Sequence, residues 1–336
     1  MLAAVGVAAA CTPQPALGSV ADLRSGKVHV VDLASCRDRV VRTGVHGQVE
    51  FTRSGTVRVR PVPRPFETSD GRFSLSVRAS GSGRSAKQTI WVTDRRSGRS
   101  HPVFSETQYY KQIGPGDTPG PIILLGWSGD DRWIFFTIDP GGSGSIAADG
   151  LILRVVPAAG GRVHELAPML VYSDYLTWCG GMLVFTAGHD RVAGAHNHLL
   201  VATPPQWRPR PLVGVPGRAW GSVSCAPGRR SVIVQSQPAS DDPSFFATRW
   251  SLWRVGLDGS MMRLTSPPPH HADESPRVSR DGRAIMFVRS RNGVGALYAL
   301  HGRTLVGPFA RLGFSPGYYG HQDWWQRLAW SRAADG

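Results

Sequence analysis

Two short groupings of histidine and carboxylate are the residues of this chain whose types and spacing could do chemistry. His270 and His271 are adjacent in a proline-rich stretch, and Asp273 follows two residues after His271. His196 and His198 are separated by one residue, so an extended chain would place both imidazoles on the same side. Imidazole and carboxylate together suit zinc or manganese. Either grouping could contribute metal ligands, and His270, His271 and Asp273 are the weak candidates for a metal site.

Motifs for other kinds of catalysis are missing from the sequence. Ser128 lies in Gly-Trp-Ser-Gly, but Asp130 stands where a nucleophile elbow requires glycine. Residues 141–145 are rich in glycine and serine, yet no helix is expected after them, so they do not predict a phosphate cradle. We therefore predict no catalytic residues and no cofactor, and we interpret Ser128 as a turn residue.

The chain is strongly basic, with 38 Lys and Arg residues against 24 Asp and Glu residues and a formal net charge of +14. Clustered cations bind the phosphates of nucleic acid by releasing counterions. Here the arginines are spread along the chain, and the densest patch, Arg58, Arg60 and Arg64, is interrupted by prolines. The pattern indicates solvated strand faces, and we predict no binding to nucleic acid.

A short phrase that recurs along the chain indicates the elements that must position these residues. Residues 278–287 read Val-Ser-Arg-Asp-Gly-Arg-Ala-Ile-Met-Phe, and residues 127–136 repeat the pattern as Trp-Ser-Gly-Asp-Asp-Arg-Trp-Ile-Phe-Phe. An Asp-Gly pair tolerates the positive φ of a hairpin turn, and the apolar runs on both sides predict strands. Repetition of such a unit at intervals of roughly fifty residues is typical of a β-propeller.

The copies predict an all-β fold with six four-stranded antiparallel blades. Five complete units follow one another, within residues 69–104, 127–166, 178–213, 232–265 and 285–306. Residues 28–41 read as the second half of a unit and residues 328–331 as the beginning of one, so the two ends are expected to share a sixth, closing blade. Residues 49–55 come too soon before the next copy to make a blade; we interpret them as an inserted hairpin, with seven blades as the alternative.

The fifth unit carries a resemblance to a known family. Residues 274–282, Glu-Ser-Pro-Arg-Val-Ser-Arg-Asp-Gly, with residues 285–293 and 297–298, resemble the repeat of TolB-type propellers, and the resemblance covers about residues 27 to 332. It implies a propeller of the envelope or periplasm that works by binding, and a structural hydrogen bond for Asp273. TolB itself carries an additional N-terminal α/β domain for which residues 27–336 leave no room, so its own partners are not transferred.

The first residues are expected to direct export. Residues 1–10 are small and apolar, and Cys11 follows three alanines as in a weak lipobox, which makes Cys11 a candidate for lipidation. We assign residues 1–26 to a signal-like, lipoprotein-like or disordered segment and residues 27–336 to a single propeller. The expected location is exported: periplasmic, extracellular or anchored at the outer face of a membrane.

Two cysteines are candidates for a disulfide. Cys179 and Cys225 both read as substitutes for the serine of the turn phrase, in consecutive units. Equivalent positions in neighbouring units make a bond plausible in an exported protein, and two small buried thiols are the alternative. A bond requires that the two Cα atoms lie within about 7 Å of each other.

Loops between the strands are where we expect recognition, because a rigid scaffold commonly carries its binding residues on loops. The candidates share aromatic or acidic side chains off the strands: Tyr109, Tyr110, Asp241, Asp242, Phe245, Phe246, Tyr318 and Tyr319. We predict a monomeric, non-catalytic binding or scaffolding module whose partner is an envelope protein or a small ligand. The alternatives are a metal-assisted hydrolase or lyase with its site at the channel mouth, and a sensor of cell-wall peptide or glycan.

Overall fold

Strands dominate the computed structural model. It describes residues 13–333 except 47, 53, 61–65, 69, 82–86, 107–121, 140–149, 241–248, 316 and 323. The helices of this part of the chain are short 3-10 turns, η1 (Pro15–Leu17), η4 (Ser173–Tyr175) and η5 (Trp324–Gln326). None of the described helices has the length and apolar character needed to span a membrane. The predicted all-β class is therefore confirmed.

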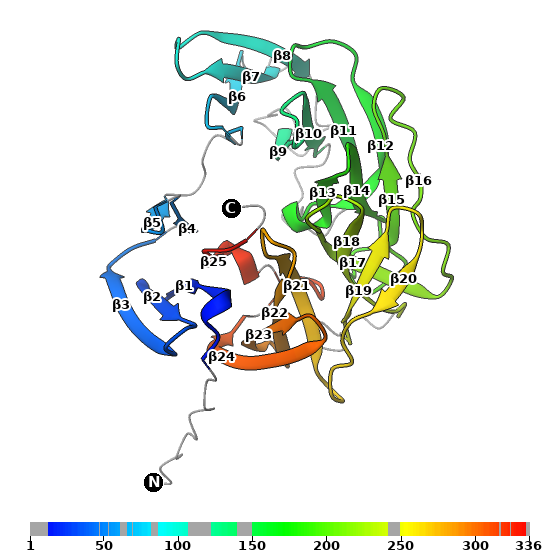
Figure 1. Ribbon diagram of the computed structural model, residues 1–336. Helices are drawn as coiled ribbons and strands as arrows, with labels where there is room; N and C mark the ends of the chain where they lie inside the picture. Colours follow the sequence, from blue (N-terminus) through cyan, green and yellow to red (C-terminus); the bar gives the residue numbers. More distant parts are fainter. Residues whose placement is uncertain are drawn as a thin grey trace, which may run out of the picture.

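Four antiparallel sheets of four strands follow one another along the chain (Figure 1). The first contains β9 (Ile122–Trp127), β10 (Trp133–Ile138), β11 (Gly150–Pro157) and β12 (His164–Leu170). The second contains β13 (Leu176–Cys179), β14 (Met182–Ala187), β15 (His198–Ala202) and β16 (Arg210–Pro211). The third contains β17 (Arg218–Cys225), β18 (Ser231–Pro238), β19 (Ser251–Gly256) and β20 (Met261–Arg263). The fourth contains β21 (Ala272–Val278), β22 (Ala284–Arg291), β23 (Val294–His301) and β24 (Thr304–Phe314).

Strands from the two ends of the chain share a further four-stranded sheet. Its order is β25 (Leu328–Trp330), β1 (Ser19–Arg24), β2 (Lys27–Asp32) and β3 (Arg37–Thr43). Ala21 on β1 pairs with Ala329 on one side and with Val30 on the other. The expectation that residues around Ala329 and Val30 lie in one sheet is confirmed, with β1 between them.

The boundary predicted at residue 27 needs a correction, because the sheet begins at Ser19. Val20, Ala21 and Asp22 are buried in succession, so β1 lacks the alternation of apolar and polar residues that identifies a half-exposed strand. Asp22 is accommodated there because the side chains of Arg24 and Arg327 pair with its carboxylate. Arg327 comes from the far end of the chain, which is why local pattern did not reveal the strand.

Two smaller sheets complete the described strands. β6 (Phe73–Ser80), β7 (Lys87–Asp94) and β8 (Ser100–Glu106) form three adjacent strands, and residues 66–68 pair beside β6 through a bridge between Glu67 and Ser74. β4 (Gln48–Phe51) and β5 (Val57–Arg60) form the expected hairpin. Val49 of this hairpin packs against Ala21 and Val30 of the sheet shared by the chain ends.

The turn phrase folds through the same hydrogen bonds in separate sheets. The Ser128 hydroxyl donates to Asp130 Oδ1 at 2.5 Å and accepts from the Trp133 amide at 3.0 Å. Ser279 repeats both bonds, to Asp281 Oδ1 at 2.6 Å and from the Ala284 amide at 2.9 Å. These bonds hold each serine inside its own turn, so the interpretation of Ser128 as a turn residue is confirmed.

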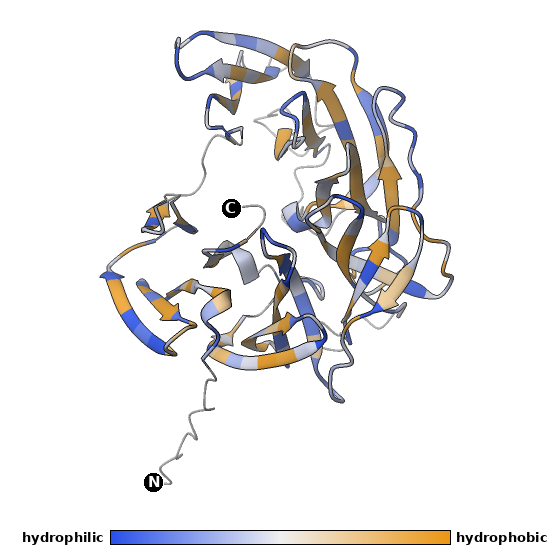
Figure 2. Ribbon diagram, viewed as in Figure 1, coloured by the Kyte–Doolittle hydropathy of each residue, from blue (hydrophilic) through white to orange (hydrophobic). Residues whose placement is uncertain are grey.

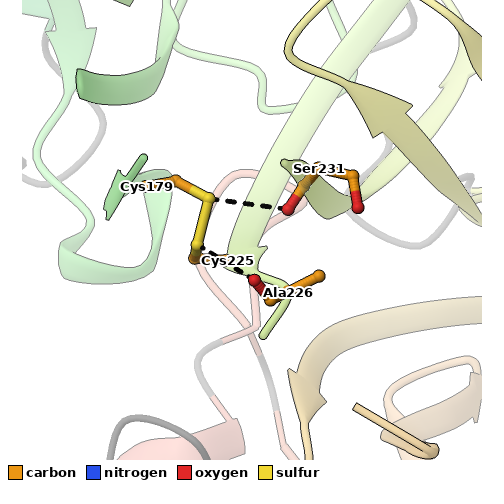
Figure 3. Close-up of a disulfide and its surroundings, with 4 residues drawn as sticks. All are labelled: Cys179, Cys225, Ala226 and Ser231. Atoms are coloured by element: carbon orange, nitrogen blue, oxygen red, sulfur yellow. Dashed lines mark hydrogen bonds between the residues drawn. A yellow bond between two sulfur atoms is a disulfide. The ribbon is translucent and has the colours of Figure 1, made fainter. Parts of the chain in front are cut away.

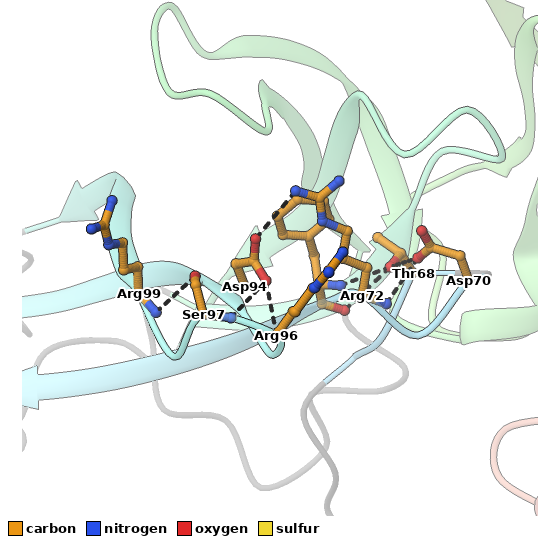
Figure 4. Close-up of polar contacts among 8 residues, drawn as sticks. Thr68, Asp70, Arg72, Asp94, Arg96, Ser97 and Arg99 are labelled. Carbon is orange, nitrogen blue, oxygen red and sulfur yellow. Dashed lines mark hydrogen bonds and ion pairs between the residues drawn. The ribbon is translucent and has the colours of Figure 1, made fainter.

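A threonine replaces the serine in the earliest described copy (Figure 4). The Thr68 hydroxyl donates to Asp70 Oδ1 at 2.6 Å, and the Arg72 amide donates to the same oxygen at 2.8 Å. In the neighbouring turn, Asp94 Oδ1 accepts from the Arg96 amide at 2.9 Å, and Arg72 pairs with the second oxygen of Asp94 at 3.3 Å. Hydrogen bonds lower the pKa of Asp70 because they favour its charged form. At Asp94, desolvation acts to raise the pKa, but the hydrogen bonds and the charge of Arg72 outweigh it and lower the pKa.

Apolar side chains follow the strands and polar ones gather at turns and loops (Figure 2). The largest cluster joins neighbouring sheets, with buried Phe135 from β10 and Phe185 from β14. Trp207 is 2% exposed; its ring centroid lies 5.0 Å from that of Trp133 and 6.2 Å from that of Trp178. Trp133 and Trp178 belong to different sheets, so these aromatic side chains fix how the two sheets pack.

Candidate functional site

The antiparallel order of the strands places the longer loops of the third sheet at one end of its strands. Arg218 at the start of β17 lies opposite Pro238 at the end of β18, and Trp253 near the start of β19 lies opposite Arg263 at the end of β20. The strands that lead into residues 239–250 and 264–271 therefore finish at the same end of the sheet, and the tight turns at residues 226–230 and 257–260 lie at the opposite end. We call the first the loop end and the second the turn end, and we use the same terms for the equivalent ends of the other sheets.

A cavity of about 430 Å³ lies at the loop end of the third sheet. Its lining combines arginines, histidines, prolines and one serine: Arg218, Arg249, Arg263, His270, His271, Pro238, Pro267, Pro268, Pro269 and Ser251. We call this the cationic cavity. Its size falls within the range of small-molecule pockets, about 300 to 1,000 Å³.

Arg218 is held in the cavity by its neighbours in the sheet. Its Nε donates to Ser236 Oγ at 3.0 Å, and its guanidinium carbon lies 4.6 Å from the centre of the Trp253 ring. This stacking fixes the plane of the guanidinium group, and its two terminal nitrogens take no part in the hydrogen bond to Ser236.

Arg263 is fixed in a similar way on the last strand of the sheet. Its Nε donates to the Thr265 carbonyl at 2.8 Å, and its Nη2 donates to Ser251 Oγ at 2.9 Å. Two cations thus approach each other: burial lowers the pKa of Arg218, and the positive charge of Arg263 lowers it further. No carboxylate in the described part of the chain forms an ion pair with Arg218, Arg249 or Arg263.

The three residues predicted as weak metal ligands are not brought together as a ligand set. His270 and His271 line the cationic cavity, where His271 Nδ1 lies 2.9 Å from the Pro269 carbonyl oxygen. Asp273 is fully buried on β21, and Arg289 donates to its two carboxylate oxygens at 2.6 and 2.9 Å. The structural role that the family resemblance implies for Asp273 is therefore present, and the metal hypothesis loses its carboxylate.

The other histidine grouping shows the predicted alternation. His196 and His198 are exposed, and Asn197 between them is buried and donates from Nδ2 to the Ala193 carbonyl at 3.0 Å. Within the described residues no group of three or more His, Cys, Asp or Glu side chains is placed to hold a metal ion.

Glu274 belongs to a buried polar cluster that sequence reasoning did not assign. Ser290 Oγ donates to its Oε1 at 3.0 Å and Trp324 Nε1 donates to its Oε2 at 2.9 Å. Burial raises the pKa of Glu274 to about 7, against the opposing effect of these two hydrogen bonds. The neutral acid is therefore the favoured form over much of the acidic range.

Replacing Glu274 with glutamine is expected to change how stability depends on pH. The folded pKa lies above the ordinary value of 4.5, so the wild type loses stability as the pH rises from about 4.5 to 7, by about 3 kcal/mol. The neutral amide of Glu274→Gln removes this loss. Urea unfolding at pH 5 and pH 7.5 measures the difference, and equal pH dependence in both proteins would show that Glu274 does not carry a raised pKa.

A second buried cluster joins three distant segments. His321 Nε2 lies 3.2 Å from Asp174 Oδ1, and Ser222 Oγ donates to Asp174 Oδ2 at 2.5 Å. Asp174, Ser222 and His321 are each no more than 4% exposed. Serine, histidine and aspartate suggest a hydrolase, but a nucleophilic serine must bond the histidine, and here it bonds the aspartate. The geometry therefore supports a structural cluster.

Tyr318 and Tyr319 lie at the loop end, between β24 and β25. Tyr318 is 39% exposed, and its carbonyl oxygen accepts from the Tyr172 hydroxyl at 3.1 Å. The Tyr319 carbonyl accepts from the Ala193 amide at 2.8 Å, and the Arg191 guanidinium lies 5.2 Å from the Tyr319 ring centre. These contacts join the loop to its neighbours and leave the Tyr318 ring partly open to solvent.

The remaining binding candidates lie outside the residues that the structure describes. They are Tyr109, Tyr110, Asp241, Asp242, Phe245 and Phe246, together with the lipidation candidate Cys11. Their assignment stays a prediction from the sequence.

Cys179 and Cys225 are joined by a disulfide (Figure 3). Their Cα atoms are 5.4 Å apart, which meets the distance condition stated from the sequence. Cys36 is also disulfide-bonded. The Cys179 sulfur lies 3.5 Å from the Ser231 carbonyl oxygen. This contact is not a hydrogen bond, because a disulfide sulfur has no proton to donate.

The prediction that Cys225 occupies the serine position of the turn phrase is wrong. The Ala226 amide donates to the Ser231 carbonyl at 2.9 Å, as the Ser279 amide donates to the Ala284 carbonyl at 2.9 Å. Ala226 therefore occupies the serine position of the turn phrase, and Cys225 stands one residue earlier. The two cysteines meet because neighbouring sheets approach here, although their positions in the phrase differ.

This chain resembles known proteins at the level of solved structures. No family model matches it, and no curated protein matches it significantly. Among solved structures, TolB from Acinetobacter baumannii has a TM-score of 0.45 at 12% identity, over 95% of this chain and 68% of that one. A TolB structure from Agrobacterium tumefaciens has a TM-score of 0.42 at 14% identity, over 92% and 95% of the two chains.

Other similar structures come from enzymes. The propeller domain of the Trilobed protease from Pyrococcus furiosus has a TM-score of 0.45 at 12% identity, over 83% of this chain and 73% of that one. A prolyl endopeptidase structure and an oligogalacturonate lyase are also similar. Similarity this low, with TM-scores below 0.5, says nothing of a shared activity, ligand or partner.

Proposed function

We propose that this protein is a non-catalytic binding or scaffolding propeller that recognises its ligand or partner at the loop end of its sheets. The cationic cavity carries the proposal. Arg218, Arg249 and Arg263 gather there without a described carboxylate to pair with them. Clustered positive charges raise the local electrostatic potential, which attracts an occupant of opposite charge.

The proposed architecture is a six-bladed propeller. Four complete sheets, the sheet of β6, β7 and β8, and the sheet shared by β25 and β1 supply the six blades, and the β4–β5 hairpin is an insertion. In this arrangement the shared sheet closes the ring. Seven blades, with the hairpin as part of an additional one, is the alternative.

The proposed location is outside the cytoplasm, in the periplasm, in the extracellular space or at the outer face of a membrane. The disulfide between Cys179 and Cys225 supports it, because such bonds persist in oxidising compartments. We propose a monomer whose partner is an envelope protein or a small ligand, without nucleic acid. The enzyme alternative is weaker, because Asp273 is engaged by Arg289.

Photo-crosslinking tests which end of the sheets makes contact with a partner. A photoreactive amino acid at Tyr318, which is 39% exposed at the loop end, is expected to crosslink to a component of the envelope fraction. Leu305 is a matched control because it is 43% exposed and lies beside the turn between β23 and β24, at the turn end. Crosslinks from Leu305 alone would contradict recognition at the loop end.

A further inference from the structure

We propose that the cationic cavity is a binding site for a small anionic ligand that carries a phosphate or carboxylate group, held by Arg218 and Arg263. This inference rests on the proposed function and names the class of ligand that the loop end would take. It is built from residues that composition alone assigns to solvated strand faces.

Several half-buried arginines elsewhere in the described part of the chain have a carboxylate partner. Arg289 pairs with Asp273, and Arg154 pairs with Glu165 at 2.8 Å. Half-buried Arg218 forms no ion pair with a described carboxylate, exposed Arg249 and Arg263 also line the cavity, and the charge of Arg263 disfavours the charged form of Arg218. An anion in the cavity would supply the missing charge, as the carboxylates do elsewhere.

Donors remain for such an anion after the internal hydrogen bonds are counted. Arg218 uses only Nε within the described structure, which leaves both terminal nitrogens for a ligand. Arg263 uses Nε and Nη2, which leaves Nη1. Because stacking on Trp253 and the bond to Ser251 hold the two guanidinium groups, little conformational entropy is lost when they bind.

The walls of the cavity also restrict the ligand. Pro238, Pro267, Pro268 and Pro269 line the cavity, and proline rings are rigid and apolar. A cavity of about 430 Å³ has room for an organic body as well as the charged group. Carboxylate and phosphate share the required chemistry, since each accepts paired hydrogen bonds from guanidinium.

Isothermal titration of the full chain tests this inference with inorganic phosphate, phenyl phosphate and citrate as separate probes. We expect at least one of the oxyanions to bind, with affinity that falls as salt is added. Arg218→Ala and Arg263→Ala should each weaken that binding by about 10- to 100-fold. Arg218→Lys keeps the charge but loses the paired donors, so it should also bind more weakly.

Arg254→Ala is the matched control, because Arg254 lies on the same strand as Ser251 and is exposed toward the turn end. It removes the same charge and should leave binding within about twofold. Thermal unfolding of each variant checks that it is folded. Binding of any of the three probes that Arg218→Ala weakens supports the site, and comparison of the two phosphates with citrate identifies its anionic group.

Two results would overturn the inference: no binding of any probe by the folded wild type, or equal loss of binding in Arg254→Ala and Arg218→Ala. The proposed function can survive either one, because the crosslink from Tyr318 does not depend on an anion. If the titration succeeds and the Tyr318 crosslink is absent, the anion site stands and a wider role for the loop end does not.

Discussion

Replacing Asp174 with alanine is expected to destabilise the fold by about 3 to 5 kcal/mol, because it leaves His321 buried without its ion-pair partner. The pair spans from η4 to the loop before β25, and Ser222 adds a hydrogen bond from β17. One carboxylate therefore holds together three segments that are distant in sequence. Urea unfolding at pH 7 measures the loss.

An exposed pair of the same chemistry provides the control. His29 Nδ1 lies 3.2 Å from Asp38 Oδ1, the same separation as in the buried pair, but the Asp38 side chain is 44% exposed. Asp38→Ala should cost about 0 to 1 kcal/mol, as exposed ion pairs do. Equal losses in Asp174→Ala and Asp38→Ala would contradict a structural role for the buried cluster.

The same variant should alter unfolding by acid. Burial acts to raise the pKa of Asp174, but the charge of His321 and the hydrogen bond from Ser222 outweigh it and lower the pKa below 3.8. A lowered folded pKa contributes stability above the ordinary value, and that contribution disappears as the pH falls through the folded pKa. We therefore expect the difference between wild type and Asp174→Ala to shrink below about pH 4.

Removing the bond between Cys179 and Cys225 is expected to cost about 4 kcal/mol in the Cys179→Ala, Cys225→Ala double variant. The bond closes a loop with a sequence separation of 46 residues, and the chain-entropy relation for that length gives this value. Thermal and urea unfolding measure the cost. The double variant avoids reductant, which would also act on the bond at Cys36.

A thiol titration of the unfolded wild type is the companion measurement. No reactive thiol from Cys179 or Cys225 is expected before reduction. If the double variant is within about 1 kcal/mol of the wild type, or if both cysteines titrate as thiols, the disulfide does not contribute as proposed.

The strands could be predicted because the turn phrase encodes its own hydrogen bonds. Ser128 and Ser279 each bond an aspartate two residues later, so the information is local. β1 could not be predicted, because the information that stabilises it is not local. Its buried Asp22 depends on Arg327, which the sequence places some three hundred residues away, and no local pattern reports that pairing.

The cationic cavity could not be predicted from composition. Its arginines are ordinary members of a basic chain until strand register brings Arg218 and Arg263 to the same edge. A usable signal did exist, since both residues stand at strand ends and the prolines at 267–269 follow closely. The cluster of Asp174, Ser222 and His321 offers no comparable signal, because its members come from three distant segments.

A crystal of the protein soaked in selenate gives the most direct measurement of the central claim that the loop end recognises an anionic ligand. Selenate is a doubly charged oxyanion whose selenium is located by anomalous scattering. We expect an anomalous peak in the cationic cavity, within hydrogen-bond distance of the guanidinium groups of both Arg218 and Arg263. A cavity without such a peak, with selenate bound only at the turn end, would contradict it.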